Sequence, residues 1–162
     1  MAYDFTKTRR VEFSETDMAG IMHFSNYFRF IESAEHAFFR SLGLRIHGSE
    51  SDGTMFGWAR VQAGCDYHAP LHYEDIVETH LYITAIGERS LSYVADLRRC
   101  DGDGHPKGDP VARARWKVVY IRRGPDEKRM RSAKIPKDVA AVISAAPNDV
   151  LKLLEKDDRT HA

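Results

Sequence analysis

Cysteine is scarce in this chain, because its 162 residues include only Cys65 and Cys100. Two cysteines without a Cys-x-x-Cys pair exclude a disulfide framework, and we expect a reducing cytoplasm as the location. The chain also lacks an apolar run close to the roughly 20 residues that a membrane helix needs. The first ten residues, MAYDFTKTRR, contain no apolar core of the kind found in signal peptides.

An excess of charge of either sign is also missing. Lys and Arg number 24, as do Asp and Glu, so the formal net charge is zero. A neutral chain has no general attraction to nucleic acid or to anionic membranes, and we expect neither as a partner. Its length predicts a single domain with a substantial core. We place that domain at residues 1–147 and expect residues 148–162 to form a helical or frayed tail.

One long helix is predicted by apolar residues that recur at helical spacing. The stripe consists of Tyr27, Ile31, Ala34, Phe38 and Leu42. Ser25 or Asn26 can cap the start of this helix, and Gly43 is placed to end it. We therefore expect about 17 helical residues, a usual length for a globular protein.

Alternation of apolar and polar residues predicts strands on both sides of this helix. One strand is expected from Lys7 to Glu15, and four follow the helix near residues 61–67, 77–85, 91–97 and 112–120. Successive strands with short links favour an antiparallel sheet, and the helix must bury its stripe against that sheet. The expected class is α+β, with a twisted sheet around a central helix.

Three short blocks carry a family resemblance. The first runs Asp17-Met18-Ala19-Gly20-Ile21-Met22-His23-Phe24-Ser25-Asn26-Tyr27. The second is Asp66-Tyr67-His68-Ala69-Pro70 followed by Asp75, and the third is Gly87 with Ser90. Together they resemble the hotdog-fold acyl-CoA thioesterases of the 4-hydroxybenzoyl-CoA thioesterase-like branch. The resemblance implies a five-stranded antiparallel sheet wrapped around one long central helix.

The resemblance also implies a reaction, the hydrolysis of an acyl- or aroyl-CoA thioester. In the family, the acid at the position of Asp17 acts as nucleophile or general base, and the backbone amide at the position of Phe24 polarises the carbonyl. No metal or redox cofactor is implied, since coenzyme A belongs to the substrate. Family members form homodimers or homotetramers with sites at subunit boundaries. The implied substrate contacts are Gly20, His23, Ser25, Asn26 and Tyr27.

His23 departs from the family pattern. Many members have Tyr then His at these two positions, whereas this chain has His23 then Phe24. The family's histidine role is therefore not transferred to His23. This residue either contacts substrate, orients Asp17, or is a partly buried loop histidine.

Simpler interpretations exist for several of these residues. Asp17 can be a turn residue, because acids before helices are common. Glu15 is a reserve general base or a surface acid. His68 and His72 are spaced like metal ligands, but Pro70 lies between them and argues against a helical metal site.

A basic segment, Arg122 to Lys134, holds six basic side chains and only two acidic ones. Arg and Lys pair well with phosphates, so this segment is a candidate for the phosphates of CoA, with a solvated basic loop as the alternative. The candidates are Arg89, Arg122, Arg123, Lys128, Arg129 and Arg131.

Two rival functions stay open from the sequence. Hotdog hydroxyacyl dehydratases carry a His-Phe-Pro stretch, which His23-Phe24 begins but Ser25 does not continue. A non-catalytic module that binds acyl-CoA or another protein is the second rival, because fold alone does not fix function.

Overall fold

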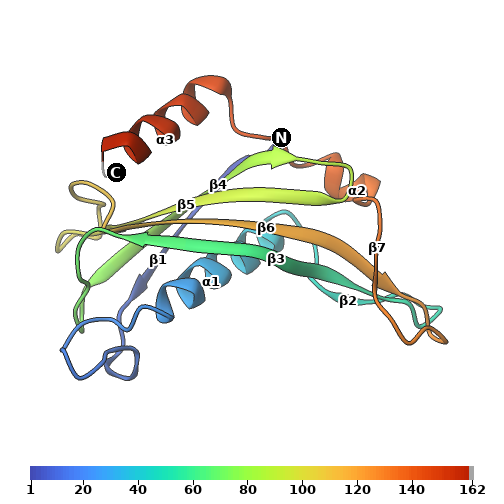
Figure 1. Cartoon of the computed structure of the whole chain (residues 1–162), viewed down its shortest axis with the longest axis horizontal. Coiled ribbons are helices and arrows are strands. Elements are labelled where there is room, and N and C mark those ends of the chain that lie inside the picture. The colour runs from blue at the N-terminus through green and yellow to red at the C-terminus, as the bar shows by residue number, and fades with distance from the viewer. Residues whose placement is uncertain (161–162) are drawn as a thin grey trace.

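The computed structural model describes the backbone of residues 1–160 and the side chains of residues 1–156. A curled sheet wraps around helix α1 (Asn26–Ser41), and helix α3 (Asn148–Thr160) lies against the opposite face of the sheet (Figure 1). A short helix, α2 (Lys137–Ala140), precedes α3. The predicted tail is thus helical up to residue 160, and residues 161–162 lie outside the described part of the chain.

The sheet has seven strands in the order β1-β4-β5-β6-β3-β2, with β7 paired to β6, and every pairing is antiparallel. The predicted five strands are its long members, and two strands of two residues each extend it. The strands are β1 (Asp4–Arg10), β2 (Gly48–Ser49), β3 (Met55–Tyr67), β4 (Ile76–Ile86), β5 (Ser90–Arg99), β6 (Ala112–Arg123) and β7 (Arg131–Ser132).

Helix α1 is buried through its apolar stripe, as predicted. Phe30, Ile31, Phe38 and Phe39 are at most 2% exposed. Burying each such side chain contributes roughly 1.5–3 kcal/mol, so this stripe fixes the helix on the concave face of the sheet. The helix has 16 residues and ends before Gly43, whose φ of +71° suits glycine.

The prediction for the first strand was wrong at its end. The strand stops at Arg10, and Phe13–Glu15 form a 3₁₀ helix. The Glu15 carboxylate accepts the backbone amide of Glu12 at 2.9 Å, and this local bond draws the chain into a turn. The alternation of apolar and polar residues from which the strand was predicted carries no information about such a local contact.

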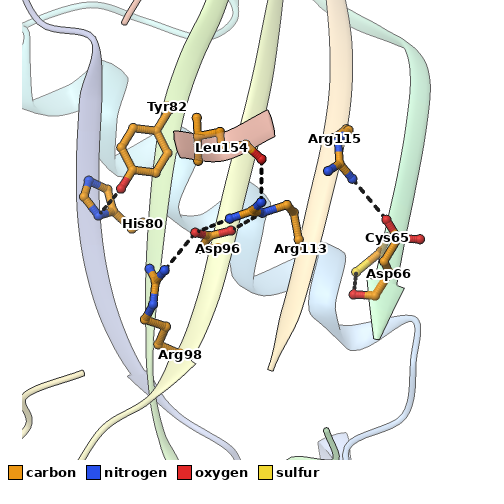
Figure 2. Close-up of polar contacts among 9 residues, drawn as sticks. All are labelled: Cys65, Asp66, His80, Tyr82, Asp96, Arg98, Arg113, Arg115 and Leu154. Carbon is orange, nitrogen blue, oxygen red and sulfur yellow. Dashed lines mark hydrogen bonds and ion pairs between the residues drawn. The ribbon is translucent and has the colours of Figure 1, made fainter. Parts of the chain in front are cut away.

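The opposite, convex face of the sheet carries a buried ion pair. Arg113 on β6 and Asp96 on β5 are 3% and 2% exposed, and they are joined by hydrogen bonds of 2.6 and 2.9 Å (Figure 2). Arg113 also donates to the backbone carbonyl of Leu154 in α3 at 2.7 Å, while Arg98 donates to Asp96 at 3.0 Å. A sheet arginine therefore attaches α3 to the convex face.

No helix in the part of the chain that the structure describes is long and apolar enough to cross a membrane.

Candidate active site

The loop before α1 holds the Asp17 carboxylate in a defined position. Asp17 Oδ1 accepts the backbone amide of Ala19 at 2.8 Å, and the Asp17 backbone exchanges hydrogen bonds with Gly20 and Ile21. Gly20 completes this tight turn with a φ of +78°, a conformation that favours glycine. The turn therefore fixes Asp17 through one carboxylate oxygen, and Oδ2 has no hydrogen bond among the described contacts.

Asp17 and Phe24 line the same cavity, which has a volume of about 500 Å³. Its other lining residues come from the loop, the start of α1 and the end of β3: Ile21, Met22, Tyr27, Tyr67, His68, Ala69 and Pro70. The lining is mainly apolar, and Asp17 is its one acidic side chain. This combination suits a ligand with an apolar group beside a reactive polar bond.

The cavity lies at the amino-terminal end of α1, which begins at Asn26. A helix amino terminus carries unpaired N–H groups and a partial positive charge. Among the described contacts, the Phe24 amide has no acceptor, whereas the His23 amide donates to Glu15 at 2.9 Å and that of Asn26 to His23 at 2.9 Å. A residue with a free amide and a residue with a carboxylate thus line one cavity.

The other predicted contacts are divided between the cavity and its supports. Tyr27 lines the cavity and is 3% exposed. The Asn26 side chain donates to the Glu15 carbonyl at 2.8 Å, so it supports the loop. His23 Nδ1 lies 2.8 Å from Ser25 Oγ, and neither of these two residues lines the cavity.

Glu15 is not a surface acid, so that part of its interpretation was wrong. It is 7% exposed and forms an ion pair with Arg9. Its backbone carbonyl also accepts the amides of His23 and the Asn26 side chain. Glu15 is therefore a support of the loop that carries Asp17.

Sequence reasoning did not assign Tyr67 and His68 to the site, although both line the cavity. Tyr67 donates from its hydroxyl to the backbone carbonyl of Phe24 at 3.0 Å. The second motif block contains both residues, which was the available signal.

The basic candidates lie at the opposite end of the molecule from Asp17. Tyr67, beside the site, pairs with Ala112 at one end of β6, whereas Met55 pairs with Arg123 at the other end. The hairpin between β6 and β7 follows there, far from the blue loop before α1 (Figure 1). Arg122 is paired with Glu50 at 2.5 Å and Arg89 donates to Ser132 at 3.1 Å, and Lys128 and Arg129 are exposed.

A larger cavity, of about 640 Å³, lies near that hairpin and does not contain Asp17. It lies between α1 and β3, and Phe56, Trp58 and Val118 supply apolar walls. Glu35, Arg60 and Arg122 are its buried or paired polar residues. Size alone would favour this cavity, but the smaller one is lined by both Asp17 and Phe24, the two residues of the expected chemistry.

Within the described residues, no three His, Cys, Asp or Glu side chains gather as a possible metal site. The absence of a metal or redox cofactor stays a prediction.

A curled antiparallel sheet around one helix is the hotdog fold, and the solved structures that this chain resembles share it. The sequence profile of the Thioesterase-like superfamily matches residues 11–143, and the chain belongs to this superfamily. Its class of reaction is thioester hydrolysis.

Individual relatives agree with this family. A protein of Aquifex aeolicus (strain VF5), provisionally named an esterase, is 32% identical over 139 residues, which are 86% of this chain and 97% of the relative. The 4-hydroxybenzoyl-CoA thioesterase of Pseudomonas sp. (strain CBS-3) is 24% identical over 145 residues, which are 89% and 100% of the two chains. A solved structure of a mutant 4-hydroxybenzoyl-CoA thioesterase with 4-hydroxybenzoyl-CoA has a TM-score of 0.71 at 22% identity, covering 88% of this chain and 100% of that one.

Proposed function

We propose that this chain hydrolyses an acyl- or aroyl-CoA thioester to the free acid and CoA, with Asp17 driving the reaction. The observation that carries the proposal is that Asp17 and Phe24, whose amide has no acceptor among the described contacts, line the same cavity. Relatives named 4-hydroxybenzoyl-CoA thioesterase and 1,4-dihydroxy-2-naphthoyl-CoA hydrolase support an aroyl-CoA substrate.

The Phe24 amide is suited to bind the carbonyl oxygen as negative charge develops on it. The Asp17 carboxylate can attack the carbonyl carbon, so that the C–S bond breaks and CoA leaves as a thiolate that takes a proton from water. Water then hydrolyses the resulting mixed anhydride. Alternatively, Asp17 removes a proton from a water molecule that attacks the carbonyl directly. Both routes need the carboxylate ionised.

Strand β3 supports a homodimer. β2 covers only Met55 and Phe56, so residues 57–67 form a sheet edge without a partner strand in the described chain. A long exposed edge readily pairs with another strand. A two-fold axis would pair two copies of β3 antiparallel, so the Met55 end of one copy would lie beside the Tyr67 end of the other.

Such a dimer would join features that are far apart in one protomer. The larger cavity and the basic hairpin lie at the Met55 end of β3, and the Asp17 cavity lies at its Tyr67 end. In the dimer, the larger cavity of one subunit would receive the acyl group of a substrate whose thioester lies at the partner's Asp17 cavity. The basic hairpin would contact the CoA phosphates of the same substrate.

A panel of thioesters with thiol release as the readout tests the proposal. It should contain aroyl-CoA, short-chain and long-chain acyl-CoA substrates, and enoyl-CoA hydration should be followed in parallel by absorbance. We expect thiol release from at least one CoA ester and no hydration. Hydration without thiol release would support a dehydratase instead, and no turnover of either kind would support a binding module.

A further inference from the structure

Tyr67 makes a contact that connects the edge strand to the proposed catalytic loop. Its hydroxyl donates a 3.0 Å hydrogen bond to the backbone carbonyl of Phe24, 43 residues away in sequence. Phe24 is also the residue whose amide is proposed to bind the thioester oxygen. The contact thus acts on the main chain at the reacting site.

The Phe24 main chain has few other restraints. Its side chain is 63% exposed and contacts the His23 ring at 4.4 Å between centroids. Its amide has no acceptor among the described contacts, so no hydrogen bond of its own sets its direction. On either side of Phe24, the His23 amide donates to the Glu15 carbonyl at 2.9 Å and the Ser25 amide donates to His23 Nδ1 at 3.4 Å. This leaves the Tyr67 hydroxyl as the polar restraint on Phe24 itself among the described contacts.

Tyr67 is itself held in place, so it can fix the orientation of the Phe24 main chain. It is paired with Ala112 at the end of β3, and its ring meets the buried Tyr27 ring edge-on at 4.9 Å. Burial, with a smaller effect of the nearby Cys65 thiol, raises the pKa of Tyr67 to about 12. The hydroxyl therefore keeps its proton at neutral pH and stays a donor.

We propose that Tyr67 is a positioning residue for thioester hydrolysis, holding the Phe24 backbone so that the Phe24 amide points into the Asp17 cavity. This inference rests on the proposed function. A donor that stabilises a developing oxyanion must be aligned before the reaction, because misplacement by about 1 Å can cost about 10²-fold in rate.

Tyr67→Phe tests this directly, since it removes only the hydroxyl. We expect kcat to fall about 10-fold or more, with KM within about 2-fold of wild type, as for an interaction made in the transition state. The melting temperature should stay close to that of wild type. Tyr73→Phe is the matched control, because Tyr73 is 50% exposed, packs on Phe13 and does not line the cavity.

A binding measurement separates positioning from other roles. In the Asp17→Asn background, benzoyl-CoA should bind without turnover, and its carbonyl stretching band should shift to lower frequency when the Phe24 amide polarises it. Adding Tyr67→Phe should reduce this shift while binding is retained.

An unchanged kcat or an unchanged band would overturn the inference. A raised KM with kcat preserved would also overturn it, because it would mean that Tyr67 binds substrate in the ground state. Failure of the proposed function looks different, since wild type would then release thiol from no ester in the panel, and the role of Tyr67 would fall with it.

Discussion

Arg60 Nη2 donates a 2.6 Å hydrogen bond to Glu35 Oε2 and so joins the exposed edge strand to the buried face of α1. Glu35 is 2% exposed, and Trp116 Nε1 donates to its other oxygen at 3.2 Å. Burial raises the pKa of Glu35 above its ordinary value of 4.5, although the Arg60 charge opposes this shift. Part of the stability of the fold should therefore depend on pH.

The sign follows from proton binding. Between pH 4.5 and the raised pKa of the folded state, Glu35 has lost its proton in the unfolded chain but keeps it in the folded chain. The free energy of unfolding should therefore fall as pH rises through this interval. The Glu35→Gln variant has no carboxyl proton at this position. As pH rises, the free energy of unfolding of wild type should therefore decline relative to that of this variant. Urea unfolding from pH 4 to 8 measures the difference, with Glu155→Gln, at an exposed position on α3, as control. The prediction would be contradicted if the free energy of unfolding of wild type minus that of Glu35→Gln stayed constant or rose with pH.

Asp17→Asn should abolish most hydrolysis while the protein stays folded. The change removes the negative oxygen but keeps the side-chain shape, and loss of a general base or nucleophile should lower kcat/KM by at least ~10²-fold. The loss of kcat/KM is measured by thiol release from one CoA ester that wild type hydrolyses. Asp109→Asn, in an exposed loop, is the matched control. Activity within a few-fold of wild type would remove Asp17 from its assigned role.

The basic hairpin should matter for CoA esters only. Neutralising Lys128 and Arg129 together should raise KM for the acyl-CoA and leave kcat nearly unchanged, since the phosphates are remote from the bond that breaks. The corresponding acyl-N-acetylcysteamine has no phosphates and should be hydrolysed as by wild type. The effect on the CoA ester should shrink at high salt.

The comparison requires kcat/KM for both substrates at two salt concentrations. Neutralising Lys107 and Lys152, two exposed lysines outside the hairpin, is the matched control. Equal losses on both substrates would show that the hairpin supports the fold or the subunit contact instead.

A charge on the free edge of β3 should disrupt the proposed dimer. Val61 is 58% exposed near the middle of that edge, so Val61→Asp would bring two acids together across the two-fold axis. We expect wild type to have at least a dimer mass by light scattering and the variant to dissociate and lose activity. Leu153→Asp, at a 62% exposed position on α3, is the control. A fully active wild-type monomer would refute the shared site.

Periodic residues made the main elements predictable. The apolar stripe of α1 and the alternation in β4 and β6 reflect burial on one face, a property that each segment carries in its own sequence. In β3 the alternation is present in the sequence, but Val61 and Tyr67 are 58% and 44% exposed. The turn around Asp17 was predictable from its motif. Glu15 was misplaced because its environment depends on Arg9 and on the Glu12 amide, from which its carboxylate accepts a hydrogen bond in a 3₁₀ turn.

The role of Tyr67 could not be derived from periodicity. Its hydroxyl meets a backbone carbonyl 43 residues away, and neither partner has a side-chain pattern that reports this contact. Likewise, the basic segment was predictable as a charge cluster, but its distance from Asp17 follows only from the register of β3 and β6. Contacts between distant segments depend on how the sheet curls.

The attachment of α3 has a consequence for how this region can change over time. Arg113 donates to the main-chain carbonyl of residue 154, and a carbonyl is present whatever side chain that position carries. Substitutions along the helix can therefore accumulate without losing this contact, provided that the backbone keeps its path. A proline or a deletion that redirects the backbone would break this hydrogen bond, whereas substitutions that keep the backbone path would leave it in place.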